Sequence, residues 1–94
     1  MKIQVDPSVQ LPIYLLAKDS GDVVRFDEIK DLSWVEAIDV ENGEYNGWDA
    51  LGRALRMTAS GTGLFKLREM DVNLAGLVLE ETEFAGIRAR AEKR

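Results

Sequence analysis

Residues 10–26 read QLPIYLLAKDSGDVVRF, and this segment fixes the type of domain. The apolar run over residues 10–18 predicts a strand, with Pro12 near its start or on a sheet edge. A tight turn is expected at residues 19–22, because Asp side chains bond the backbone that follows and glycine adopts positive φ without penalty. Residues 23–26 return as a second strand, so the segment predicts a β-hairpin.

A short helix is expected at residues 27–37. Asp27 can cap this helix by accepting hydrogen bonds from the free amides of its first turn. Three apolar residues recur at helical spacing, namely Ile29, Leu32 and Val35. The Asn42-Gly43 pair that follows is a turn signal, which fits either a hairpin or the exit of a helix into a strand.

Residues 44–80 predict a meander of strands. Asp49 and Gly52 lie at the turn of a second hairpin, because Asp opens a type I turn and Gly supplies the left-handed residue of a bulged loop. The expected strands span residues 44–48, 53–59, 64–70 and 74–80, with further turns at residues 60–63 and 71–73.

A second helix is expected at the C-terminal end, where Thr82 can cap the first turn. Its apolar stripe consists of Phe84, Ile87 and Ala91. Basic residues near its end complement the negative end of the helix dipole. A rival interpretation makes residues 74–94 one long helix, but Gly76 and Gly86 disfavour it, because glycine lowers helix stability.

Together these elements predict a single α+β domain over residues 1–94, with residues 1–9 as a loosely ordered lead-in. The order is hairpin, helix, meander and C-terminal helix. Strands joined by tight turns form an antiparallel sheet, here of four to six strands, and the two helices cover one face of it. The expected core residues are Ile13, Leu15, Ile29, Leu32, Val35, Leu55, Leu67, Leu77, Leu79, Phe84 and Ile87.

Composition restricts the chemistry. The 94 residues include no cysteine and no histidine, which excludes a disulfide framework, a thiol nucleophile and an imidazole base. Carboxylate, lysine or tyrosine chemistry and oxygen-ligated metals remain. No apolar run has the length of a signal peptide or a membrane span. We therefore expect a cytoplasmic protein that is not an enzyme, needs no cofactor and does not contact a membrane.

Charge is distributed unevenly. Residues 19–49 hold ten acidic residues against two basic ones, a net charge of −8, whereas the whole chain carries −5. An acidic surface repels nucleic acid and attracts basic proteins, chiefly by steering their approach. The expected partner is therefore another protein with a basic surface, and not a nucleic acid. A surface that only keeps the protein soluble is the alternative explanation of the same charges.

The segment from residue 39 to residue 49 combines acids, glycines and aromatic rings. Rings bury a large area on binding, and acids select a basic partner. The predicted partner-binding residues are Asp39, Glu41, Glu44, Tyr45, Trp48 and Asp49. Tyr45 and Trp48 are three apart, so on a regular strand they face opposite sides and one of the two is expected outside.

The sequence contains two further motifs, an acidic cluster at residues 39–44 and a glycine-containing stretch at residues 60–66. Asp39, Glu41 and Glu44 place three carboxylates within six residues, so a small calcium- or magnesium-binding domain or enzyme is an alternative, although the spacing of a calcium loop is absent. Residues 60–66 resemble a phosphate loop but lack its glycine spacing and its helix. A self-assembling subunit is a further alternative, because an unpaired sheet edge can pair with a second copy.

Two motifs stand out: DSGDV at residues 19–23, followed by Phe26, and IDVENGEY at residues 38–45, followed by WDA at 48–50 and GR at 52–53. In these motifs the chain resembles a group of small bacterial proteins of uncharacterised function. The resemblance covers about residues 13–57 and implies no catalytic residue. In size and acidity the chain is also similar to bacterial immunity proteins, which neutralise a toxin domain by binding it. That likeness implies an inhibitor or immunity-type binding module.

Overall fold

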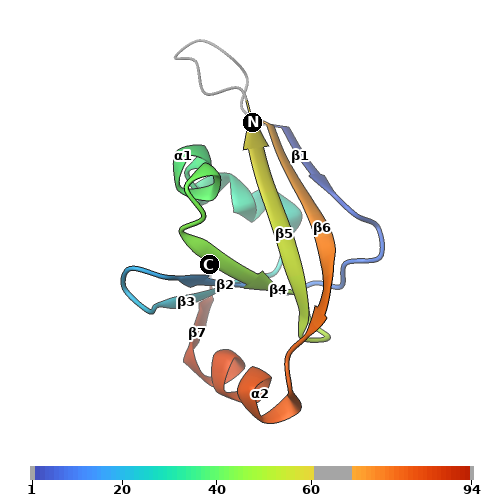
Figure 1. Cartoon of the computed structure of the whole chain (residues 1–94), viewed down its shortest axis with the longest axis vertical. Helices are drawn as coiled ribbons and strands as arrows, with labels where there is room; N and C mark the ends of the chain where they lie inside the picture. Colours follow the sequence, from blue (N-terminus) through green and yellow to red (C-terminus); the bar gives the residue numbers. More distant parts are fainter. Residues whose placement is uncertain (1, 61–68, 94) are drawn as a thin grey trace.

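The computed structural model describes residues 2–60 and 69–93. Within these ranges, seven strands form one sheet in the order β1-β6-β5-β4-β2-β3-β7 (Figure 1). The strands are β1 (Lys2–Val5), β2 (Ile13–Ala17), β3 (Val23–Phe26), β4 (Tyr45–Trp48), β5 (Arg53–Ser60), β6 (Glu69–Val78) and β7 (Ala91–Lys93). The helical segments are the 3-10 helix η1 (Ile29–Trp34), α1 (Ala37–Glu41) and α2 (Glu81–Arg90). The protein is therefore a small α+β domain, as predicted.

The sheet is mixed, and the prediction of four to six antiparallel strands was wrong. β1 pairs in parallel with β6, and β7 pairs in parallel with β3, whereas the other neighbours are antiparallel. Residues 2–5, expected in a loosely ordered lead-in, form β1 at one sheet edge. β1 and β7 each pair with a strand that is far away in the sequence. Local turn signals cannot predict such pairing.

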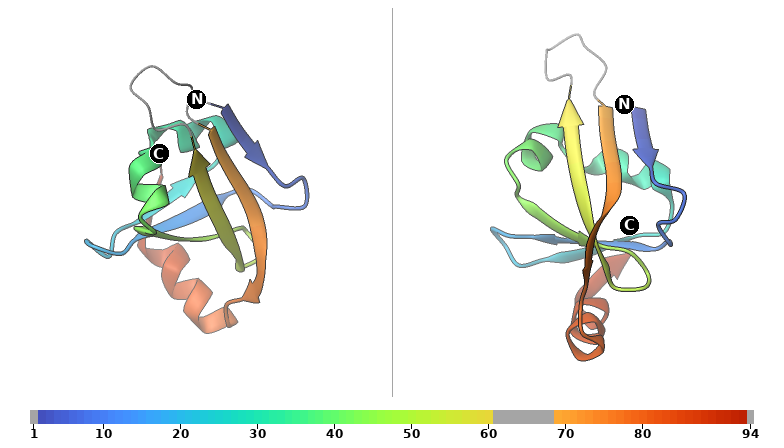
Figure 2. Two further views of the ribbon diagram at one scale, coloured as in Figure 1. Left: turned by 45° about the horizontal axis from the view of Figure 1, so that its top comes forward. Right: turned by 45° about the vertical axis from the view of Figure 1, so that its right-hand side comes forward.

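The helices lie on opposite sides of the sheet and not on one face. In Figures 1 and 2, η1 and α1 lie on one side of β2, β3 and β4, and α2 lies on the other side. The single helix expected at residues 27–37 is replaced by η1 and then α1. Asp27 caps neither helix, and its carboxylate instead lies 3.1 Å from Arg25 and 3.2 Å from Lys93.

The two hairpins were predicted correctly. Gly21, in the turn between β2 and β3, has φ 75°, and Gly52, between β4 and β5, has φ 74°, so both use the left-handed region that favours glycine. The Asn42-Gly43 pair forms the exit of α1 into β4, which decides between the two interpretations left open. The predicted turn at residues 60–63 falls largely outside the described residues.

Strand β6 replaces the last part of the predicted meander. The turn expected at residues 71–73 is absent, since these residues belong to one continuous strand of ten residues. Polar Asp71 and Asn73 face solvent, while Met70 and Val72 between them are buried. The strand that was predicted to begin at residue 64 starts outside the described residues. A strand followed by helix α2 is confirmed over the long-helix alternative.

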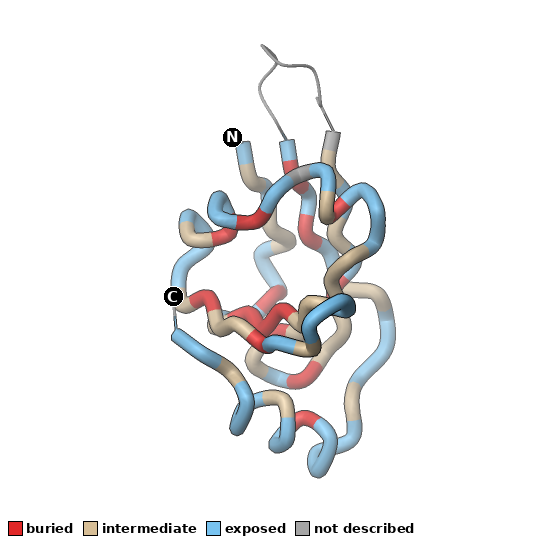
Figure 3. The backbone as a smooth tube through the Cα atoms, turned by 90° about the vertical axis from the view of Figure 1, so that its left-hand side faces the viewer, coloured by how far each residue is buried: buried red, intermediate tan, exposed pale blue. Residues whose placement is uncertain are grey.

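Two hydrophobic clusters stabilise the sheet, one on each face. The larger cluster packs strands β2, β5 and β6 against η1 and α1, and includes Ile13, Leu15 and Leu32. In the smaller cluster Phe84 of α2 packs against Tyr14 and Val23. The Tyr14 and Phe84 rings meet edge to face at 5.4 Å, a favourable aromatic geometry. Figure 3 shows buried residues gathered along the strands between the helical segments.

Most of the predicted core residues are buried or half-buried. Ile29 and Leu77 are exceptions, because η1 turns Ile29 outward and Leu77 follows the positive-φ Gly76 near the exposed end of β6. Leu67 lies outside the described residues. Buried residues that the sequence patterns missed are Val9, Tyr14, Val23, Phe26, Val40, Met70 and Val72. In the part of the chain that the structure describes, no helix has the length and apolarity needed to cross a membrane.

Candidate functional site

A cavity of about 190 Å³ opens on the same sheet face as the larger hydrophobic cluster. It lies between the β2–β3 hairpin, the first residue of β4 and the end of η1. The lining residues are Leu15, Ala17, Ser20, Asp22, Val24, Phe26, Trp34, Val35 and Tyr45. They are mostly apolar, with polar residues confined to the β2–β3 turn and the Tyr45 hydroxyl.

Strand register explains the apolar walls. Leu15 of β2 pairs with Val24 of β3, and Ile13 pairs with Phe26. Side chains alternate along a strand, so paired residues and those two positions away share a face of the sheet. Leu15, Val24 and Phe26 therefore project together beneath η1, where they form the floor of the cavity.

Trp34 is the most exposed large apolar residue at the cavity. It is the last residue of η1, and 73% of its surface is accessible. Its neighbours Leu32 and Val35 are buried and fix η1 on the core. Because η1 is anchored by these two residues, the Trp34 side chain is held at the cavity while remaining open to solvent.

Acidic residues from separate parts of the chain act on the Tyr45 hydroxyl. Burial raises the pKa of the Tyr45 hydroxyl above its ordinary value of 10.0, and the negative charges of four carboxylates raise it further. These four residues are Asp39, Asp19, Glu36 and Glu44. They come from the β2–β3 turn, the start of α1 and the loop before β4, so folding concentrates negative charge at one place.

The backbone holds these acidic segments together. The Glu44 amide donates to the Asp39 carbonyl at 3.0 Å, and the Lys18 amide donates to the Glu44 carbonyl at 2.9 Å. The loop before β4 is thereby tied both to α1 and to the end of β2. Of the described residues that line the cavity, Asp22 is the charged one and none is basic.

The predicted aromatic pair is split between the two sheet faces. Tyr45 packs against the larger cluster and Trp48 against the smaller one, as the spacing of three predicted. Neither ring is fully outside, because both faces of the sheet are covered at β4. Trp48 therefore does not share a surface with Tyr45. Gly47, on the Tyr45 face, leaves no room for a side chain, since a Cβ there would lie 2.9 Å from Leu15.

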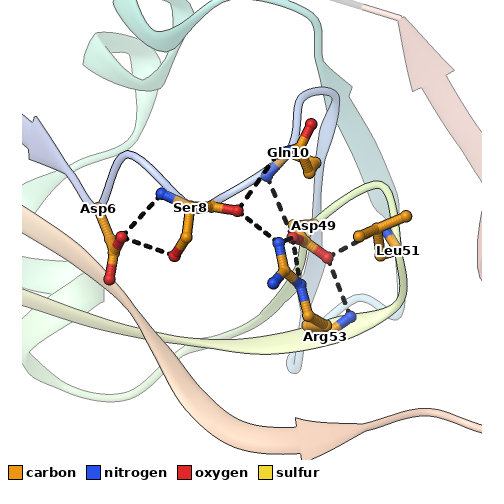
Figure 4. Close-up of polar contacts among 6 residues, drawn as sticks. All are labelled: Asp6, Ser8, Gln10, Asp49, Leu51 and Arg53. Carbon is orange, nitrogen blue, oxygen red and sulfur yellow. Dashed lines mark hydrogen bonds and ion pairs between the residues drawn. The ribbon is translucent and has the colours of Figure 1, made fainter.

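Asp49 does not reach the surface predicted for it. Its side chain is fully buried, with 0% exposure, and it accepts five hydrogen bonds (Figure 4). The donors are the amides of Gln10, Leu51 and Arg53 and two guanidinium nitrogens of Arg53, at 2.7 to 3.1 Å. Asp49 closes the β4–β5 hairpin and fastens the segment before β2 to it.

The hydrogen bonds also determine the charge of Asp49. Burial by itself raises the pKa of this carboxyl, but the bonds from Arg53 and from the Gln10, Arg53 and Leu51 amides outweigh burial and lower it below 3.8. Arg53 in turn donates to the Ser8 carbonyl. The sequence patterns identified Asp49 as a turn residue and as a binding residue, and the structure supports only the first role.

Asp39, Glu41 and Glu44 lie on α1 and the loop that follows, with Glu41 exposed and the other two half-buried. Among residues 2–60 and 69–93, no three acidic side chains are arranged so that they could hold a metal ion. The alternative of a calcium or magnesium site at these three residues therefore gains no support.

Trp34 was missed by the sequence patterns. It lies one residue before Val35 and off the stripe formed by Ile29, Leu32 and Val35, and this displacement is the signal that indicates an exposed tryptophan. Comparison of the chain with protein-family models, with curated proteins and with solved structures gives no match.

Proposed function

We propose that this protein is a non-enzymatic binding module that docks a basic surface of another protein through its acidic half. The main supporting observation is that Tyr45, whose pKa is raised by burial and by Asp39, Asp19, Glu36 and Glu44, lines one cavity with Asp22 and the exposed ring of Trp34. Clustered acids steer a basic partner toward the site. An exposed tryptophan supplies the large apolar area that is typical of interface hot spots.

An inhibitor or immunity-type protein that acts in the cytoplasm is the specific form of this proposal. It follows from the resemblance in size and acidity and from the lack of cysteine. Asp49 and Trp48 are not part of the proposed surface, since Asp49 is buried and Trp48 packs on the opposite sheet face. The remaining predicted residues, Asp39, Glu41, Glu44 and Tyr45, stay in it.

Affinity capture with three baits, the native chain and two variants matched in charge, tests the proposal. We expect the native chain to retain basic proteins from a lysate, and the double variant Asp39→Lys with Glu44→Lys to lose them. The control is Glu69→Lys with Asp71→Lys, which makes the same change in net charge at exposed positions of β6. Retention of the same proteins by all three baits, or of none by the native chain, would contradict an acidic docking surface.

A further inference from the structure

The cavity lined by Trp34 and Tyr45 is suited to bind one type of side chain from a partner protein. We propose, on the basis of the proposed function, that it receives an arginine of the partner protein. The aliphatic stem of that arginine lies against the apolar floor, and its guanidinium lies between the aromatic rings and the acidic rim.

Size favours one side chain over a small-molecule ligand. The cavity measures about 190 Å³, whereas sites for small molecules and cofactors usually measure about 300–1,000 Å³. A cavity below that range, open on one side to an exposed tryptophan, accommodates a single long side chain presented by a protein surface.

The lining selects a side chain with an apolar stem and a cationic head. Leu15, Val24 and Phe26 form the apolar part. Asp22 lies at the rim, and the four acids that act on Tyr45 make the surroundings negative. Lysine and arginine both combine an apolar stem with a positive head that stays near water.

The aromatic rings and Asp22 favour arginine. A guanidinium is planar and weakly hydrated, so it stacks on tryptophan and tyrosine rings more readily than an ammonium. It also matches the two oxygens of a carboxylate, and Asp22 forms no ion pair within the described part of the chain. Arg90, which approaches the same turn, donates instead to the Gly21 carbonyl.

A titration of the full chain with single blocked amino acids tests this inference. The probes are N-acetyl-arginine N-methylamide, its lysine counterpart, and its citrulline counterpart, which has nearly the same shape without the charge. We expect saturable NMR shifts of the Trp34 indole and of Tyr45 with arginine. Binding of the citrulline probe should be about tenfold weaker, because charge and ring act together at the site.

Variants assign the binding to the cavity. Trp34→Ala and Asp22→Asn should each weaken arginine binding several-fold, whereas Leu77→Ala and Asp71→Asn should leave it unchanged. The two controls remove an exposed apolar side chain and an exposed carboxylate from β6. No saturable shift up to the solubility of the probe, shifts on another surface, or equal binding of arginine, lysine and citrulline would each overturn the inference.

The two proposals fail separately. If lysate capture depends on Asp39 and Glu44 but the arginine probe does not bind in the cavity, the acidic docking surface stands and the arginine cavity is wrong. If the arginine probe binds in the cavity but no basic protein is captured, the cavity stands as an arginine site and the docking function is wrong.

Discussion

At the scale of single residues, Asp49 is expected to contribute strongly to stability. Asp49→Ala removes the acceptor of five hydrogen bonds and leaves Arg53 and three amides without their partner. We expect a loss of about 3 kcal/mol in the free energy of unfolding, the usual effect of breaking a buried, hydrogen-bonded ion pair. Urea denaturation measures it. Asp71→Ala, at an exposed strand position, should change stability by less than about 0.5 kcal/mol.

Asp49 also makes the free energy of unfolding depend on pH in the acidic range. Because the folded protein lowers the pKa of Asp49 below its ordinary value of 3.8, the unfolded chain takes up the proton first as the pH falls. The stabilisation is thus complete above that ordinary value and is lost as the pH falls through the folded pKa. As the pH falls, the free energy of unfolding of Asp49→Asn should decrease less steeply than that of the native chain. Parallel curves for the two proteins would contradict this assignment.

The pKa of the Tyr45 hydroxyl measures the effect of the acidic residues that act on it. Its raised pKa results first from burial and then from four carboxylates. Asp39→Asn with Glu44→Gln should therefore lower the pKa of Tyr45 only partly, because burial remains. Absorbance titration in a Tyr14→Phe background measures the change at a single tyrosine. An unchanged titration would mean that these acids do not face the hydroxyl, and the proposed docking surface would lose its main support.

At the scale of elements, the sequence predicted what local chemistry determines. The hairpins follow from turns at Gly21 and Gly52 that need left-handed backbone. β1 and β7 were not predicted, because each pairs in parallel with a distant segment. The false turn at residues 71–73 has a similar cause, since Asp71 and Asn73 are the exposed residues of an alternating strand. Of the candidate site, Asp39, Glu44 and Tyr45 were predicted, whereas Asp19, Glu36 and the cavity that places Tyr45 beside Trp34 depend on the fold.

Two positions on helix α2, one buried and one exposed, are expected to change stability in opposite directions. Phe84 is its buried residue, packed on Tyr14 and against Gly52. Phe84→Ala should lower the free energy of unfolding by about 3 kcal/mol, as for other buried rings. Gly86→Ala on the same helix should raise it by about 0.5–1 kcal/mol, because the added methyl meets nothing within 4 Å and alanine favours helix. Thermal unfolding distinguishes both from the native chain, and equal stabilities would show that α2 is not docked.

At the scale of the whole molecule, the sheet edges bear on the self-assembly alternative. The edge strands are β1, with four residues, and β7, with three. Both strands are short, which is one way in which proteins limit edge pairing, although β1 pairs with only residues 69–72 of β6. The acidic half adds repulsion, because two copies that meet through it bring like charges together.

We therefore expect a monomer in light scattering at high protein concentration and at low ionic strength, where repulsion is strongest. Raising the salt concentration shortens the distance over which the acidic surfaces of two copies repel each other. If a dimer then appears, Trp34→Ala indicates its origin. A dimer lost in this variant arises from the exposed ring, whereas one that persists arises from a sheet edge. A stable oligomer already present at low salt would contradict the prediction and favour the self-assembling subunit over a module that docks a basic partner.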